Sequence, residues 1–150
     1  MNAFTLLKED HKRVSDIFEK LAATTERAVK TREELFTRLK TELEAHAQIE
    51  EQVFYPALKQ EEETRDITLE GIEEHKVVKR LLKELDGMQV NSEEWTAKLA
   101  VLKENVEHHV EEEEGEMFTK ARRALPKQKL EALGESIQAA KKRAAATSRG

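Results

Sequence analysis

The chain has 150 residues, of which 38% are charged, and its formal net charge is -5. This length gives room for one domain with a hydrophobic core, and five glycines, two prolines and few aromatic residues favour long amphipathic helices over a β-rich fold. Cysteine is absent, which excludes disulfides, thiolate zinc sites and a cysteine nucleophile, and the negative charge gives no overall attraction to nucleic acid or anionic membranes.

Apolar residues recur at alternating steps of three and four along most of the chain and predict an all-α protein. The first helix is expected over about residues 5–22. Thr31 and Glu34 form a capping-box pair that predicts the start of a second helix, which Pro56 should kink or end.

A third helix is expected to end at Gly87, and Asn91 or Ser92 should cap a fourth. Pro126 is expected to open a fifth, shorter helix that runs to about Ala145. From Lys127 onward six basic residues stand against two acidic ones, so the C-terminal tail is locally basic.

Two stretches of the chain repeat. "DHKRVSDIFEKL" from Asp10 is similar to "EHKVVKRLLKEL" from Glu74, and "HAQIEEQVFY" from His46 is similar to "HVEEEEGEMF" from His109, at offsets of 64 and 63 residues. Two helical hairpins, neither able to bury its own apolar stripe, are predicted to pair into an antiparallel up-down four-helix bundle. We expect this bundle over residues 1–125, and a short extra helix with a basic tail over 126–150.

Six titratable residues interrupt the apolar stripes at matching places in the two repeats. Each repeat supplies one histidine from its first helix and a His-x-x-x-Glu pair from its second, a spacing that puts both members of the pair on one helix face. The candidate metal ligands are His11, His46, Glu50, His75, His109 and Glu113. Because burying these groups unpaired would be costly, two divalent metal ions are predicted, with Glu50 and Glu113 bridging them.

Helical phase divides the run "HHVEEEEGEMF" into inner and outer residues. His109 and Glu113 continue the apolar stripe of the helix. The remaining charged residues are expected to be mainly surface charge: His108, Glu111, Glu112 and Glu114. Tyr55 lies two residues past a stripe position, and we expect it to pack at the edge of the bundle. The alternative is that it approaches the metal cavity as a hydrogen-bond donor or redox residue.

Imidazole and carboxylate donors without thiolate suit iron, and ligand type alone does not reject manganese or zinc as substitutes.

The pattern H…HxxxE…H…HxxxE, with its flanking "DHKRV", "HAQIEEQVFYP", "EHKVV" and "HHVEEEEGEMF", resembles the hemerythrin-like, HHE cation-binding domains over roughly residues 5–122. The resemblance implies a four-helix bundle around a non-haem, carboxylate-bridged di-iron centre, with an oxo or hydroxo bridge, that reacts with dioxygen, peroxide or nitric oxide. It places the family's ligands on the same six positions.

One position departs from the oxygen-carrying members of that family. They have a further histidine four residues after the ligand of the third helix, where this chain has Lys79. The six ligands together with a hydroxo bridge therefore leave about two coordination positions for water or substrate. Reversible oxygen transport is less expected than redox chemistry, reaction with peroxide or nitric oxide, or iron sensing, and a catalase- or peroxidase-like activity stays open.

Other architectures and functions remain as alternatives. Ferritin-like carboxylate bundles use Glu-x-x-His pairs, and no glutamate stands three residues before any of the four histidines, so that architecture is disfavoured. An iron- or oxygen-responsive sensor or iron store without turnover is the main alternative function. A metal-free helical interaction bundle is a further one.

The N-terminus has no signal pattern, and no run approaches the roughly 20 apolar residues of a membrane span. We therefore expect a cytoplasmic protein, either a monomer or a weak dimer. The expected partners are a small-molecule oxidant and an electron donor of unknown identity, and neither nucleic acid nor a membrane.

Overall fold

The structure is a computed structural model that describes residues 2–149, and the regular structure of these residues is entirely helical. The all-α prediction is therefore confirmed. In chain order the elements are α1 (Ala3–Ala22), α2 (Val29–Ile49), the π-helical turn η1 (Glu50–Phe54), α3 (Tyr55–Lys59), α4 (Glu62–Asp86), α5 (Glu93–Glu112), the π-helical turn η2 (Glu113–Met117), α6 (Phe118–Ala124) and α7 (Lys127–Arg149). Within the described residues, no helix is both long and apolar enough to cross a membrane.

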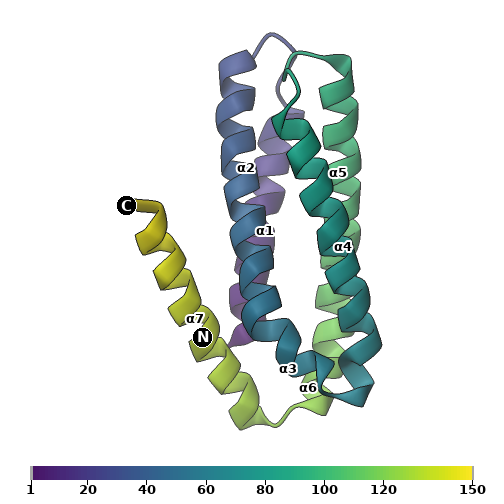
Figure 1. The fold of residues 1–150 in the computed structure, drawn as a ribbon, viewed down its shortest axis with the longest axis vertical. Helices are drawn as coiled ribbons and strands as arrows, with labels where there is room; N and C mark the ends of the chain where they lie inside the picture. The colour runs from purple at the N-terminus through teal and green to yellow at the C-terminus, as the bar shows by residue number, and fades with distance from the viewer. Residues whose placement is uncertain (1, 150) are drawn as a thin grey trace.

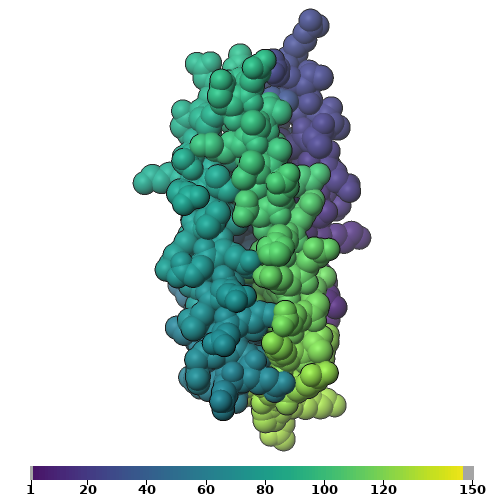
Figure 2. All heavy atoms as spheres, turned by 90° about the vertical axis from the view of Figure 1, so that its right-hand side faces the viewer, coloured from purple at the N-terminus to yellow at the C-terminus, as the bar shows by residue number. Residues whose placement is uncertain are grey.

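Helices α1, α2, α4 and α5 lie along the long axis of the molecule, and we call them the bundle (Figure 1). α2 continues through η1 into α3, and α5 continues through η2 into α6. α1 packs against α2, and α4 packs against α5. Figure 2 shows the face on which α4, in teal, lies beside α5 and its continuation, in green.

Helix α7 turns back along one side of the bundle and packs against α1, α2 and η1 (Figure 1). The predicted fifth helix after Pro126 is present, but it extends to Arg149 and has 23 residues, so it is longer than the short helix expected to end near Ala145. The stretch after Ser136 is rich in alanine, lysine and arginine, which have high helix propensity, and this composition continues the helix through the expected frayed end.

The ends of the helices follow local capping signals in most places. Ser92 accepts a hydrogen bond from the backbone N–H of Trp95 at 3.1 Å, and α4 ends with Gly87 as its C-cap, as predicted. The predicted capping box of α2 is wrong, because the helix begins at Val29 and its N-cap residue makes no side-chain bond. Thr31 and Glu34 therefore lie inside the helix, where buried Arg32 donates to the carbonyl of Val90 at 2.7 Å.

The hydrophobic core consists of two clusters that lie on either side of a polar layer. The loop-side cluster includes Val14, Leu43 and Leu102, and the α7-side cluster includes Leu7, Phe54 and Ile137. Between them, along the helices, lie the six residues that we call the polar layer: His11, His46, Glu50, His75, His109 and Glu113. Two apolar clusters therefore enclose the candidate site from both ends.

Substitution of Leu102 by alanine should lower the free energy of unfolding by about 2–5 kcal/mol, because Leu102 is fully buried in the loop-side cluster and its removal leaves a cavity. Val101 is the matched control, since it is 45% exposed, and its alanine variant should change stability by about 0.5 kcal/mol or less. Denaturant unfolding of both variants measures the difference, and equal losses would contradict this assignment of the core.

Candidate metal centre

The two glutamates of the polar layer each begin a π-helical turn. The backbone N–H of Tyr55 donates to the carbonyl of Glu50, and that of Phe118 donates to the carbonyl of Glu113. In an α-helix, the side chain five residues on would point about 140° away, whereas the wider π turn brings it toward the same face. Pro56 has no N–H to donate, which is consistent with the change of helix type in the first repeat.

The six predicted residues all lie together in the interior, and each is buried. Their inner atoms are close: His46 Nε2 and His75 Nε2 each lie 3.1 Å from Glu50 Oε1. On the other side, His11 Nε2 lies 3.1 Å from Glu113 Oε1, and His109 Nε2 lies 3.3 Å from Glu113 Oε2. The donors form two groups that share Glu50, one with His11, His46 and Glu113 and the other with His75 and His109.

Each histidine of the layer contacts a second carboxylate through its outward nitrogen. We call these four acids the outer carboxylates. The Nδ1-to-oxygen distances are 2.6 Å for His11 and Glu114, 2.8 Å for His46 and Asp10, 2.8 Å for His75 and Glu51, and 2.6 Å for His109 and Glu74. A proton on each Nδ1 would be donated to its acid, and the lone pair of each Nε2 would then face the interior.

Sequence reasoning missed the outer carboxylates, although the repeat contains a signal for them. An acid directly precedes His11 and His75, and an acid directly follows Glu50 and Glu113. Glu114 was expected to be mainly a surface charge, and that prediction is wrong in part, because its carboxylate is bound to His11. His108, in contrast, has a side chain that is 63% exposed, as its helical phase predicts.

The interior of the polar layer is rich in acceptors and poor in donors. Two buried carboxylate oxygens, Glu50 Oε2 and Glu113 Oε1, make no hydrogen bond with any described residue. Inward lone pairs and carboxylates repel one another unless cations or protons lie between them. The donor set of nitrogen and oxygen atoms therefore fits divalent metal ions.

In the protein without metal, protons take the place of these cations. Burial lowers the pKa of His46, but the carboxylates of Glu50 and Asp10 outweigh it and hold the pKa well above its ordinary value. Burial also lowers the pKa of His109, but its hydrogen bonds to Glu113 and Glu74 outweigh this effect and raise the pKa to about 10. Burial raises the pKa of Glu113, whereas its interactions with the neighbouring Glu50, His109 and His11 hold it well below the usual range.

Tyr55 lies within the polar layer and not at the edge of the bundle, so the expectation of edge packing is wrong. It is fully buried, and its hydroxyl donates to Glu113 Oε2 at 2.6 Å and lies 3.2 Å from Glu50 Oε1. It also lies 3.2 Å from His109 Nε2 and 3.3 Å from His75 Nε2. The π turn explains the error, because it moves Tyr55 onto the face of Glu50.

Burial and the charges of Glu50 and Glu113 raise the pKa of Tyr55 well above its ordinary value, so its hydroxyl keeps its proton when metal is absent. Gly71 of α4 makes room for this hydroxyl. A Cβ at Gly71 would lie 3.3 Å from the Tyr55 oxygen and 3.4 Å from His109 Cε1. The second repeat has Phe118 at the place of Tyr55, so the oxygen beside His75 and His109 has no counterpart from the second repeat.

A cavity of about 40 Å³ lies against the four histidines on the loop side. Seven aliphatic residues line it beside the histidines: Val14, Leu43, Ala47, Val78, Leu82, Val106 and Val110. Glu44 and Lys79 also line it, and Lys79 Nζ is bound to Glu51 at 2.9 Å. The space next to the layer is therefore small and mainly apolar.

Comparison with known proteins adds a family to this geometry. The model of the hemerythrin HHE cation binding domain matches residues 2–121. A crystal structure of a hemerythrin HHE cation binding domain-containing protein from Mycobacterium kansasii has a TM-score of 0.85 and 26% identity, and the match covers 98% of this chain and 89% of that one.

A DNA nickase from Nostoc sp. (strain PCC 7120) is 28% identical over 141 residues, which is 94% of this chain. This chain spans only 39% of the length of that protein. The similarity therefore concerns one part of the relative.

The free energy of unfolding of the metal-free protein should fall as the pH rises from 6.5 to about 10, because the pKa of His109 increases from 6.5 to about 10 on folding. A raised pKa stabilises the fold fully below the unfolded value, and the contribution is lost as the pH rises through the folded value. Denaturant unfolding of chelator-treated protein at several pH values measures this slope. The exposed His108→Gln variant should keep it, and a stability that does not change over this range would contradict the assignment.

Proposed function

The chain belongs to the hemerythrin HHE cation-binding domain family. We propose that its polar layer holds two iron ions that react with dioxygen or nitric oxide. The observation that carries the proposal is the convergence of four Nε2 atoms and two carboxylates between apolar clusters, with every Nδ1 already bound to an acid. On this proposal, residues 1–125 form an antiparallel up-down four-helix bundle around the iron, and residues 126–150 are an appended helix.

The donors divide between the two ions by their grouping. His11 and His46 would bind one ion, His75 and His109 the other, and Glu50 and Glu113 would lie between them, since Glu50 is common to both groups. The group with His75 has fewer donors, and the hydroxyl oxygen of Tyr55 lies within reach to complete it. Manganese or zinc would fit the same donors. When bound, an iron pair supplies electrons to a small oxidant.

The protein's own residues orient the site and keep it dry. The outer carboxylates hold each imidazole ring in one orientation, with its Nε2 directed inward. The two apolar clusters exclude water from both ends of the layer. Without metal, the Tyr55 hydroxyl donates to Glu113 Oε2 at 2.6 Å, which holds its oxygen beside the donors of the layer.

The apolar cavity favours a diatomic gas over peroxide. A buried water needs roughly 10–15 Å³ of such space, so a cavity of about 40 Å³ holds a molecule of a few heavy atoms. Its aliphatic wall offers few hydrogen bonds to a polar ligand such as peroxide, whose desolvation would be uncompensated. Dioxygen and nitric oxide carry no such cost.

DNA nicking, the activity named for the Nostoc relative, does not enter this proposal. That protein extends well beyond the segment that this chain matches.

Replacing Glu113 with alanine should abolish binding of the iron pair, because it removes a carboxylate that both halves of the layer contact. The matched control is Glu112→Ala, which removes the neighbouring, partly exposed carboxylate and should keep the metal. Metal analysis after anaerobic addition of ferrous iron and removal of excess metal measures the number of ions per chain. Equal metal loss in the two variants would show that the helical phase of this segment has been misassigned.

Wild-type protein loaded with ferrous iron should contain two ions per chain and change its optical spectrum on exposure to dioxygen or nitric oxide. Tyr55→Phe should keep the ions and alter the spectrum, since the tyrosine oxygen lies among the donors of one half. Loaded protein that is inert to both gases would favour the alternative of an iron store. Sustained consumption of peroxide would replace gas binding by a catalase-like function, whereas a single stoichiometric burst would exclude turnover.

A further inference from the structure

Asp10 differs from the other outer carboxylates in its burial. Its side chain is 4% exposed, whereas those of Glu51, Glu74 and Glu114 are 27–34% exposed. Water can solvate the three glutamates but not the aspartate. Protein groups must therefore offset the lost hydration of the Asp10 carboxylate. Its hydrogen bond to His46 Nδ1, at 2.8 Å, is therefore sensitive to what else binds the carboxylate.

Helix α7 supplies a cation for this carboxylate. Lys141 Nζ is bound to Asp10 Oδ1, while Asp10 Oδ2 faces the ring of His46. Arg13 also contacts Oδ1, but its side chain is 48% exposed and also reaches Glu42, whereas that of Lys141 is 23% exposed. Lys141 is the more buried of the two cations, and it comes from outside the bundle.

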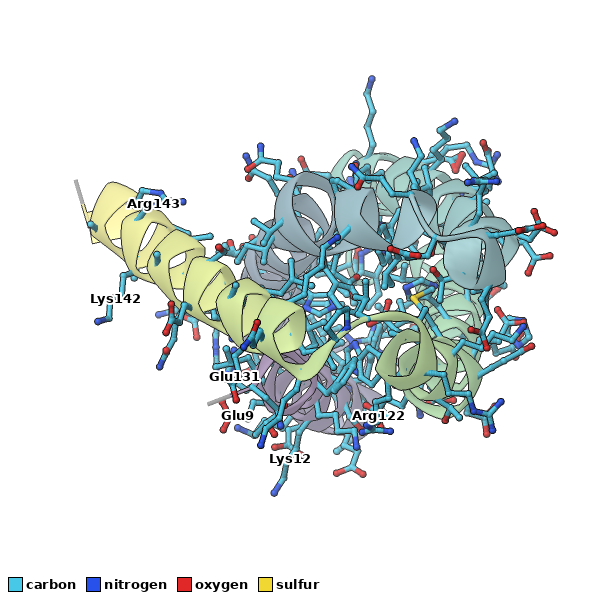
Figure 3. All side chains as sticks on the ribbon, turned by 90° about the horizontal axis from the view of Figure 1, so that it is seen from below. Glu9, Lys12, Arg122, Glu131, Lys142 and Arg143 are labelled. Atoms are coloured by element: carbon cyan, nitrogen blue, oxygen red, sulfur yellow. The ribbon has the colours of Figure 1, made fainter. Side chains whose placement is uncertain are left out.

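Lys141 occupies a place in the helix where an apolar residue would be expected. It follows Leu133 and Ile137 at steps of four, and these two residues pack against the α7-side cluster. A lysine that continues a buried stripe points toward the bundle because of its helical phase. The next residue, Lys142, extends away from the bundle (Figure 3). The packing of α7 against the bundle therefore places Lys141 beside Asp10.

We propose that Lys141 is a positioning residue of the candidate metal centre, which holds His46 in place through Asp10 and so couples the docking of α7 to metal occupancy. The inference rests on the proposed function, because it requires His46 to bind metal. An acid that fixes a ligand imidazole strengthens metal binding, and Lys141 holds that acid in place through its contact with Oδ1. The coupling is reciprocal, so bound metal stabilises the docked helix to the same extent.

The first experiment compares the rate of iron release to a chelator in the full-length loaded protein. Lys141→Met keeps an apolar stem on the buried stripe and removes the charge, and it should release iron about tenfold faster, at the low end of the effect of losing a direct partner of a ligand. Lys141→Arg should restore slow release. Lys142→Met is the matched control with an outward side chain and should behave as the wild type.

A second measurement separates this role from a merely structural one. In an Asp10→Asn background, Lys141→Met should add little to the release rate, because the residue through which it acts is already changed. Hydrogen exchange of the amides of residues 130–140 should be slower in loaded than in metal-free wild type, and the difference should shrink in Lys141→Met.

The outcomes distinguish the two claims. A wild-type protein that binds no metal would refute the proposed function, and the inference with it. If the wild type retains metal while Lys141→Met releases it at the wild-type rate, only the coupling is refuted. The coupling is equally refuted if Lys141→Met has its full effect in the Asp10→Asn background, because Lys141 would then act by another route.

Discussion

The arrangement of this molecule depends on one electrostatic constraint, which is that a layer of carboxylates and imidazole lone pairs lies between two apolar clusters. Such a layer is unfavourable unless positive charge enters it. Protons provide the charge in the metal-free protein, as the raised pKa values of His46 and His109 show. The same imidazole nitrogens and carboxylate oxygens are ligands of divalent cations. The arrangement that is unfavourable without positive charge is therefore also suited to bind metal.

The internal repeat explains how a short chain builds this layer, and its departures from symmetry show where the two halves differ. Each repeat contributes the same donors and the same π turn. Tyr55 has Phe118 as its counterpart, so an extra oxygen lies beside His75 and His109 only. Asp10 corresponds to Glu74, yet it is buried under α7. The two halves of the layer therefore have unequal surroundings.

Periodicity and the repeat were sufficient to predict an all-helical chain and to gather six inward residues, because helical phase places these six on the apolar stripes. The π turns were not predictable in this way, and a single extra residue per turn moved Tyr55 from the edge into the layer. The start of α2 also differs from the capping-box prediction, because the helix begins at Val29 without a side-chain cap and includes Thr31 and Glu34. The outer carboxylates were visible in the repeat, but their role depends on which helices meet.

The pairing of His11 with Glu114 and of His75 with Glu51 links the two hairpins in both directions. Each hairpin alone contains two of the four histidines of the polar layer and only one member of each of these two pairs. In the first hairpin, His11 therefore has its acid only when residue 114 of the second hairpin is packed against it, and Asp10 has Lys141 only when α7 is docked. The complete polar layer with its outer carboxylates is thus a property of the packed fold and not of either hairpin alone.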